Sequence, residues 1–241
     1  MKLDSAYALT ERVLYWRMPR VYRALYSAYK ALTDRRERAL YVRCIRPGMT
    51  VADVGANIGV NTALFADLVG PGGAVHAFEP EPENFARLSA ALRGRAYVTP
   101  VQAAVAEAGG ERTLYLSPDL NVDHRLYDPG DGRRKVTIRS VALDDYFAER
   151  AVGFVKIDIQ GFECQALRGM RRVLAQPGCR GVVFEYFPAG WQAAGGDWAQ
   201  AAGLLEGLGY RLHTVDRQPV SASAPPPVGS AGYTNVAALR D

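Results

Sequence analysis

The sequence predicts an α/β fold, a mostly parallel sheet with helices on both faces, and two patterns carry this prediction. Between residues 47 and 241, short apolar runs bounded by Gly or Pro alternate with segments whose apolar residues recur every three or four positions. The first run, VADVGANIG at 51–59, reads as a buried strand and a glycine-rich turn, and a helix follows over 60–69. Strand, turn and helix in this order form the first half of a nucleotide-binding βαβ unit.

The other elements follow from the same patterns, separated by Pro- and Gly-rich breaks. Two segments, RTLYLS and KVTIRSV, instead alternate apolar and polar residues. This alternation predicts an inserted pair of antiparallel strands, joined by a long polar loop. In chain order we expect strands at 51–54, 74–79, 97–101, 112–117, 135–141, 154–159, 181–187, 210–215 and 234–239, and helices at 60–69, 83–92, 162–174 and 198–208, with a short helix from 143.

Length and composition indicate one globular domain with a small appendage. Apolar residues make up 49% and charged residues 22% of the 241-residue chain, which are ordinary globular values. Three widely spaced cysteines, Cys44, Cys164 and Cys179, look like free thiols. Neither a secretory signal nor an apolar run long enough to span a membrane is present, so we expect a soluble, cytoplasmic protein.

The net charge of +4 is unevenly distributed along the chain. Residues 1–46 hold eleven Lys or Arg and four Asp or Glu, a balance of +7, which leaves −3 for residues 47–241. We expect 1–46 to form a basic helical arm, broken near Pro19, beside a ligand-binding domain at 47–241. Three interpretations of the arm stay open: a helical cap that lines the substrate cleft or a homo-oligomer contact, a basic amphipathic face on a membrane or an acidic carrier, and structural packing alone. Nucleic-acid binding is not expected, because no recognisable motif accompanies the basic residues.

The turn after the first strand indicates which nucleotide would bind. Asp53 precedes Gly55, Asn57 and Gly59, and the turn lacks the third glycine of the dinucleotide motif. Glu79 ends the second strand, where a carboxylate can accept hydrogen bonds from two ribose hydroxyls. Two acids in these places suit a cationic nucleoside without a pyrophosphate, such as S-adenosylmethionine. The alternative is that Asp53 caps the helix and Glu79 is a surface acid.

The segment after the third strand supplies two further candidates. In such folds this segment lies beside the adenine of the ligand. Gln102 and Ala103 are therefore candidate cofactor contacts.

Acids at other strand ends are candidates for catalysis. Lys156 and Asp158 point to the same side of one strand, which indicates either a buried structural ion pair or an acid in the cleft. Transfer to an alcohol benefits from a general base, and Asp158, Glu185 and the loop residue His124 are the available bases. No cluster of His, Cys and carboxylates has metal-site spacing, although acids at adjacent strand ends could hold Mg²⁺.

Several separated segments together resemble one family. VADVGANIGVNTALFADL, VHAFEPEPENFARL, SVALDDYF and FVKIDIQGFECQALRGM are similar, in matching order, to the FkbM family of S-adenosylmethionine-dependent methyltransferases. The resemblance implies a class I methyltransferase fold with a seven-stranded, Rossmann-like sheet, and O-methylation of a hydroxyl on a sugar, polyketide or other secondary-metabolite or glycan acceptor.

Carried over by position, the resemblance also assigns roles to individual residues. The turn from Asp53 to Gly59 would form the cofactor loop and Glu79 would hold the ribose, while Asp158, Gly161 and Glu163 would lie at the cleft. Gln160 departs from the family, which often has glutamate there, so a mechanism that needs a second acid at this position is in doubt.

Two other functions compete with methyl transfer. A nicotinamide-dependent oxidoreductase would use a related sheet, but the missing third glycine and Asp53 argue against it. A non-catalytic protein would use the basic arm to dock the domain on a membrane or a carrier.

Overall fold

The computed structural model describes residues 14–15, 17–118 and 121–240. Its helices are α2 (Pro19–Thr33), α3 (Arg35–Cys44), α4 (Val60–Val69), α5 (Pro82–Ala91), α6 (Leu143–Phe147), α7 (Glu163–Arg168), α8 (Arg171–Ala175), α9 (Pro188–Ala193) and α10 (Trp198–Gly207). Its strands are β1 (Thr50–Val54), β2 (Ala74–Phe78), β3 (Val98–Val101), β4 (Ala104–Val105), β5 (Gly110–Leu116), β6 (Arg134–Val141), β7 (Phe154–Ile157), β8 (Gly181–Tyr186), β9 (Arg211–Thr214) and β10 (Thr234–Leu239).

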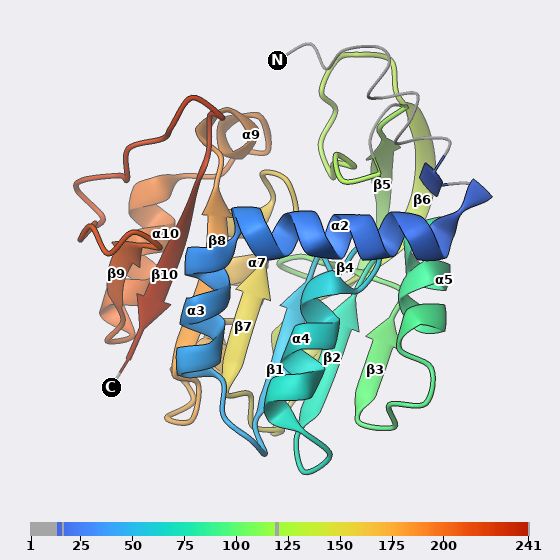
Figure 1. Cartoon of the computed structure of the whole chain (residues 1–241). Helices are drawn as coiled ribbons and strands as arrows, with labels where there is room; N and C mark the ends of the chain where they lie inside the picture. Colours follow the sequence, from blue (N-terminus) through green and yellow to red (C-terminus); the bar gives the residue numbers. More distant parts are fainter. Residues whose placement is uncertain (1–13, 16, 119–120, 241) are drawn as a thin grey trace.

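Seven of the strands form one sheet in the order β3-β2-β1-β7-β8-β10-β9 (Figure 1). The pairs among β3, β2, β1, β7 and β8 are parallel, and β10 runs antiparallel to both of its neighbours. The strand order reverses between β1 and β7, and ligands of such sheets bind at the carboxyl ends of the strands near this point. The predicted α/β class, with a mostly parallel seven-stranded sheet, is confirmed.

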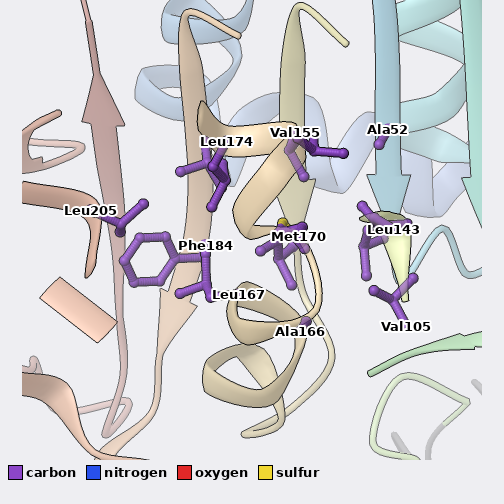
Figure 2. Packing of buried hydrophobic residues seen from close by; sticks show 14 of the residues in the cluster. Ala52, Val105, Leu143, Val155, Ala166, Leu167, Met170, Leu174, Phe184 and Leu205 are labelled. Atoms are coloured by element: carbon purple, nitrogen blue, oxygen red, sulfur yellow. The ribbon is translucent and has the colours of Figure 1, made fainter. Parts of the chain in front are cut away.

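Helices cover both faces of this sheet, as expected from central strands that are buried along almost their whole length. On one face, side chains of α3, α4 and α5 pack on Val51, Val75 and Phe154. On the other face, α6, α7, α8 and α10 pack on the alternate strand positions (Figure 2). Val155 and Phe184 are among the fully buried side chains of this second layer.

The basic arm is continuous with this core. Helix α2 begins at Pro19, where a proline needs no hydrogen-bonded N–H, and this agrees with the predicted break. Tyr41 of α3 is fully buried, with its ring edge-on to Phe65 and Phe154. Figure 1 shows α2 lying across the sheet at the carboxyl ends of β7, β1 and β2.

Three elements differ from the sequence prediction. The expected pair of inserted strands is part of a three-stranded sheet, in which β4 pairs in parallel with β6. Strand β4 has only two residues, too few for an alternating pattern to predict it. The helix expected over 162–174 is two helices, because Gly169 lies against the backbone of the β4 segment, where a Cβ would come 2.0 Å from the carbonyl oxygen of Ala106. Helix α9 was not predicted. Within the described part of the chain, no helix is long and apolar enough to cross a membrane.

Candidate functional site

A cavity of about 820 Å³ lies at the carboxyl edge of the sheet. Its walls come from α2, the turn after β1, the end of β2, residues 103–105, the loop at 121–126, the ends of β7 and β8, and residues 231–233. This volume falls in the upper part of the usual range for small-molecule sites, roughly 300–1,000 Å³. The cavity is large enough for a nucleoside and part of a second substrate.

The glycines of the turn after β1 allow chain segments to pack closely. Gly55 has a φ of +79°, and a Cβ there would lie 1.9 Å from the carbonyl oxygen of Asp158. Gly59 has a φ of +83°, and a Cβ there would lie 2.8 Å from Leu88 Cδ1. The two glycines therefore bring the ends of β1 and β7 together and seat α4 against α5, and only Gly55 also lines the cavity.

We expect Gly55→Ala to destabilise the fold by at least about 2 kcal/mol, because the new Cβ has no space and the backbone conformation favours glycine. Urea denaturation of the full chain measures this. Gly178→Ala is the matched control, since a Cβ there meets nothing within 4 Å, and it should change the free energy of unfolding little. Equal losses in both variants would contradict the packing role of Gly55.

Glu79 is buried at the end of β2 and lines the cavity. Its carboxylate accepts hydrogen bonds from the backbone N–H groups of Asn57 (2.8 Å) and Glu81 (3.0 Å). Burial raises the pKa of Glu79 to about 7, although the two N–H donors act in the opposite direction. Glu79 is thus fixed against the turn, with its carboxyl group available to a ligand.

A cluster of amides closes the cavity beside Glu79. Asn57, whose φ of +49° is rare for a residue with a side chain, donates from Nδ2 to the carbonyl of Asn121 at 2.9 Å. Asn84 Nδ2 donates to the same carbonyl at 3.0 Å, and Tyr22 of α2 donates to Asn121 Oδ1 at 3.0 Å. The turn after β1, α5, the polar loop and the arm therefore meet at Asn121.

Asp53 and Asp158 share one buried lysine. Asp53 and Lys156 are direct partners in the parallel pairing of β1 and β7. Lys156 Nζ lies 3.3 Å from Asp158 Oδ2 and 3.8 Å from Asp53 Oδ1. Asp53 is fully buried and also accepts a 2.6 Å hydrogen bond from Thr62, whereas the side chain of Asp158 is 36% exposed and lines the cavity. Lys156 and Asp158 therefore form an ion pair, and the acid of this pair also lines the cavity.

Electrostatics shift the pKa values of two cavity acids in opposite directions. Burial opposes the charge of Asp158, but attraction to Lys156 and Lys30 lowers the pKa of this carboxyl below its ordinary value. Burial, with Asp158 and Glu163 nearby, raises the pKa of Glu185 well above its ordinary value. Gln160 Nε2 donates to Asp158 Oδ1 at 3.2 Å and to Glu185 Oε2 at 3.4 Å. A neutral amide at position 160 therefore bridges two acids, where a glutamate would add a third.

Glu163 shapes the chain rather than lining the cavity. It is fully buried, and its carboxylate accepts hydrogen bonds from the N–H groups of Ile159 (2.9 Å) and Gly161 (3.0 Å) and from Trp191 Nε1 (2.8 Å). Gly161 has a φ of +104°, and a Cβ there would lie 2.8 Å from the backbone of Gly190. These contacts fix the turn that places Asp158 and Gln160 at the cavity.

His124 lines the cavity, but its hydrogen bonding argues against a role as a base. The backbone N–H of Ser117 donates to Nδ1 at 3.0 Å, which places the proton of the neutral ring on Nε2. Burial, together with Arg133 and Arg134, lowers the pKa of His124 to about 4 despite the opposing effect of Asp123. His124 therefore presents a hydrogen-bond donor.

Most of the predicted site residues come together. Gly55, Asn57, Glu79, Ala103, His124, Asp158 and Glu185 line the cavity. Five do not: Asp53 is enclosed behind Lys156, Gly59 faces α5, Gln102 is exposed, and Gly161 and Glu163 form the turn after β7. Asp53 thus does not reach the cavity as the sequence prediction required, because the strand register directs its carboxylate to Lys156.

Sequence reasoning missed the residues that α2 contributes and, apart from His124, those that the polar loop contributes. Tyr26, Tyr29 and Lys30 line the cavity from α2, and Asn121 lines it from the loop. The apolar repeat of the arm was the only sequence pattern that concerned these residues. It predicted a helix, but not which side of the helix would face the cavity. Among the described residues, no group of three or more His, Cys, Asp and Glu could hold a metal ion, so the Mg²⁺ prediction gains no support.

Comparison with known proteins decides the family. A family model described as Methyltransferase FkbM domain matches residues 53–212, the segment that holds the turn after β1, Glu79 and Asp158. The chain belongs to this family. It is therefore an S-adenosylmethionine-dependent methyltransferase, which disfavours the nicotinamide-dependent alternative.

Two relatives and one solved structure illustrate the match. The 31-O-demethyl-FK506 methyltransferase FkbM of Streptomyces tacrolimicus is 32% identical over 211 residues, covering 74% of this chain and 78% of the relative. The hexuronic acid methyltransferase AglP of Haloferax volcanii is 29% identical over 127 residues, covering 51% of this chain and half (50%) of the relative. The structure of an assumed rRNA methylase from Clostridium thermocellum superposes with a TM-score of 0.51 at 14% identity, covering 84% of this chain and 92% of that one, and this likeness concerns the fold alone.

The charges around the cavity fit the cofactor of the FkbM family. Five acids line it (Asp34, Glu79, Asp123, Asp158 and Glu185) against two basic residues, Lys30 and Arg125. Each basic residue is paired with one of these acids, Lys30 with Asp34 and Arg125 with Asp123. The cavity lining therefore offers carboxyl groups, and no cation without a partner, to a sulfonium ligand.

Proposed function

We propose that this FkbM-family chain transfers the methyl group of S-adenosylmethionine to a hydroxyl of a sugar, polyketide or related secondary metabolite. The observation that carries the proposal is Asp158, a carboxylate held in its ionised form at the strand end, in a cavity that Glu79 also lines. The named activities of the two relatives, on a demethylated FK506 and on a hexuronic acid, support a hydroxyl-bearing acceptor.

In this proposal the cofactor occupies the side of the cavity nearest the turn after β1. Glu79 accepts hydrogen bonds from the ribose hydroxyls, and Ala103 borders the adenine. Gly55 lies at the methionine end, directly beside the backbone of Asp158. Asp53 acts indirectly, by holding Lys156 beside Asp158.

The acceptor occupies the opposite side, between α2 and the ends of β7 and β8. Tyr26 and Tyr29 provide aromatic surface, and Gln160 and Glu185 provide polar groups that can hydrogen-bond to the acceptor. The bound cofactor supplies an electrophilic methyl group on its sulfonium. Asp158 accepts the hydroxyl proton as the oxygen attacks, and Lys156 keeps this carboxylate ionised until then.

The test is methyl transfer from isotope-labelled S-adenosylmethionine to a panel of acceptors: uronic acid glycosides, neutral glycosides and hydroxylated macrolides. We expect a product with one added methyl group in at least one class, and loss of that product in Asp158→Asn. Transfer only to amines or thiols would contradict the proposed acceptor chemistry, and unchanged transfer in Asp158→Asn would contradict the role of Asp158.

A further inference from the structure

The exposed apolar side chains of this protein gather around one helix. Eight large apolar side chains are exposed in the described part of the chain. Four of them are on α2 and one is its N-cap residue, two lie in the segment before β10, and one is on α3. They are Met18, Val21, Leu25, Tyr29 and Leu32, then Val228 and Tyr233, and finally Val42.

Met18 and the four residues of α2 form one stripe, which we call the outer stripe. Their spacing of three or four residues places them on one side of the helix. Exposure along it is high, from 41% at Val21 to 73% at Leu32. The neighbouring side of α2 faces inward, where Tyr22 is only 4% exposed. The helix is thus apolar toward solvent as well as toward the protein.

The outer stripe continues into the rim of the cavity. Leu25 and Tyr29 belong to the stripe and also line the cavity, and Tyr233 does the same from the other side. Singly scattered exposed apolar residues need no explanation, but a run that borders a ligand cavity marks an interaction surface.

The charge beside the stripe is positive. Arg17 and Arg20 lie at the start of α2 and Arg35 follows its end, and all three are exposed. None of them forms an ion pair with another described residue. The first 46 residues carry +7, whereas residues 47–241 carry −3. The positive charge is therefore concentrated on the segment that presents the apolar stripe.

We propose that the outer stripe lies on the surface of an anionic lipid bilayer, so that the mouth of the cavity opens at the lipid–water interface. A helix parallel to the surface inserts its apolar side chains between headgroups while arginines contact lipid phosphates. A second copy of this chain is a poorer occupant, because a two-fold contact through the stripe would bring the arginines of both copies together. The apolar stripe thus matches the hydrocarbon region of the bilayer, and the arginines beside it match the negative charge of the lipid headgroups.

The test is flotation of the full chain with vesicles of phosphatidylcholine alone, or of phosphatidylcholine mixed with phosphatidylglycerol. We expect binding to the mixed vesicles that weakens with added salt, and little binding to phosphatidylcholine alone. The double variant Val21→Ser/Leu32→Ser, which leaves the cavity lining intact, should weaken binding about tenfold. Val42→Ser removes an equally exposed apolar side chain from α3 and should bind as the wild type does.

A charge series completes the test. Arg17→Gln/Arg20→Gln should reduce binding to the mixed vesicles, whereas Arg180→Gln, an exposed arginine at the opposite edge of the sheet, should not. Titration with S-adenosylhomocysteine and thermal melting show that each variant is folded. Absence of wild-type binding to anionic vesicles, or equal binding by the stripe variant, would overturn the proposal. A wild-type dimer that Val21→Ser/Leu32→Ser dissociates would also overturn it, in favour of a second copy on the stripe.

Discussion

Replacing Lys156 with methionine should destabilise the fold by about 3–5 kcal/mol, because it leaves two acids at a buried site without their shared counterion. Lys156 is 3% exposed and lies within 4 Å of both Asp53 and Asp158, and it also donates to the carbonyl of Gly55 at 3.4 Å. Methionine fills a similar volume, so the loss reflects charge rather than an empty cavity. Urea denaturation at neutral pH measures the free energy of unfolding.

An exposed ion pair provides the control for Lys156→Met. Arg36 pairs with Asp216, and the two side chains are 74% and 48% exposed. Arg36→Met should therefore cost less than about 1 kcal/mol. A loss in Lys156→Met no larger than in Arg36→Met would contradict the role of Lys156 as the cation that holds the two acids.

Replacing Glu79 with alanine should weaken S-adenosylhomocysteine binding by roughly 10- to 150-fold, the equivalent of about 1.5–3 kcal/mol for a charged hydrogen-bonding group. Calorimetric titration measures the change. Glu79 also holds the turn after β1 through Asn57, so Glu79→Gln is the matched variant that keeps the size and one acceptor oxygen. It should lose less affinity than Glu79→Ala.

Cofactor binding should depend on pH through the same group. Burial raises the pKa of Glu79 to about 7, so the unliganded site is increasingly protonated as the pH falls through this value. The ionised carboxylate accepts hydrogen bonds from both ribose hydroxyls more strongly than the protonated form, and affinity should therefore fall by up to about tenfold between about pH 8 and about pH 6. Burial also raises the pKa of Glu163 to about 7, so this group could titrate in the same pH range. The variant Glu79→Gln separates the two groups, because it removes the titration of Glu79 and keeps that of Glu163. A full pH dependence that persists in Glu79→Gln would assign the titration to another group.

Features of the fold that depend on local sequence patterns were predicted correctly. Strand β10 occurs at the expected residues, and α4 begins and ends where the apolar repeat does. The parallel sheet followed from alternating strands and helices, and Glu79 was located from the end of its strand.

Features that depend on register between distant segments were not predictable in this way. The position of Asp53 opposite Lys156 is set by the pairing of β1 with β7, which no local pattern encodes. The hydrogen bonds to Asn121 join four separate segments, and the tautomer of His124 depends on the N–H of Ser117. The sequence of the arm likewise predicted a helix. It did not predict that Tyr26 and Lys30 would face the cavity, because this depends on how the helix packs on distant segments.

The central claim is that the cavity is an S-adenosylmethionine site, and competition calorimetry tests it most directly. Titration of the full chain with S-adenosylhomocysteine should show one site per chain, and prior saturation with S-adenosylmethionine should abolish the signal. NADH at the same concentration should leave the titration unchanged. The absence of binding at millimolar S-adenosylhomocysteine, or displacement by NADH, would contradict the account.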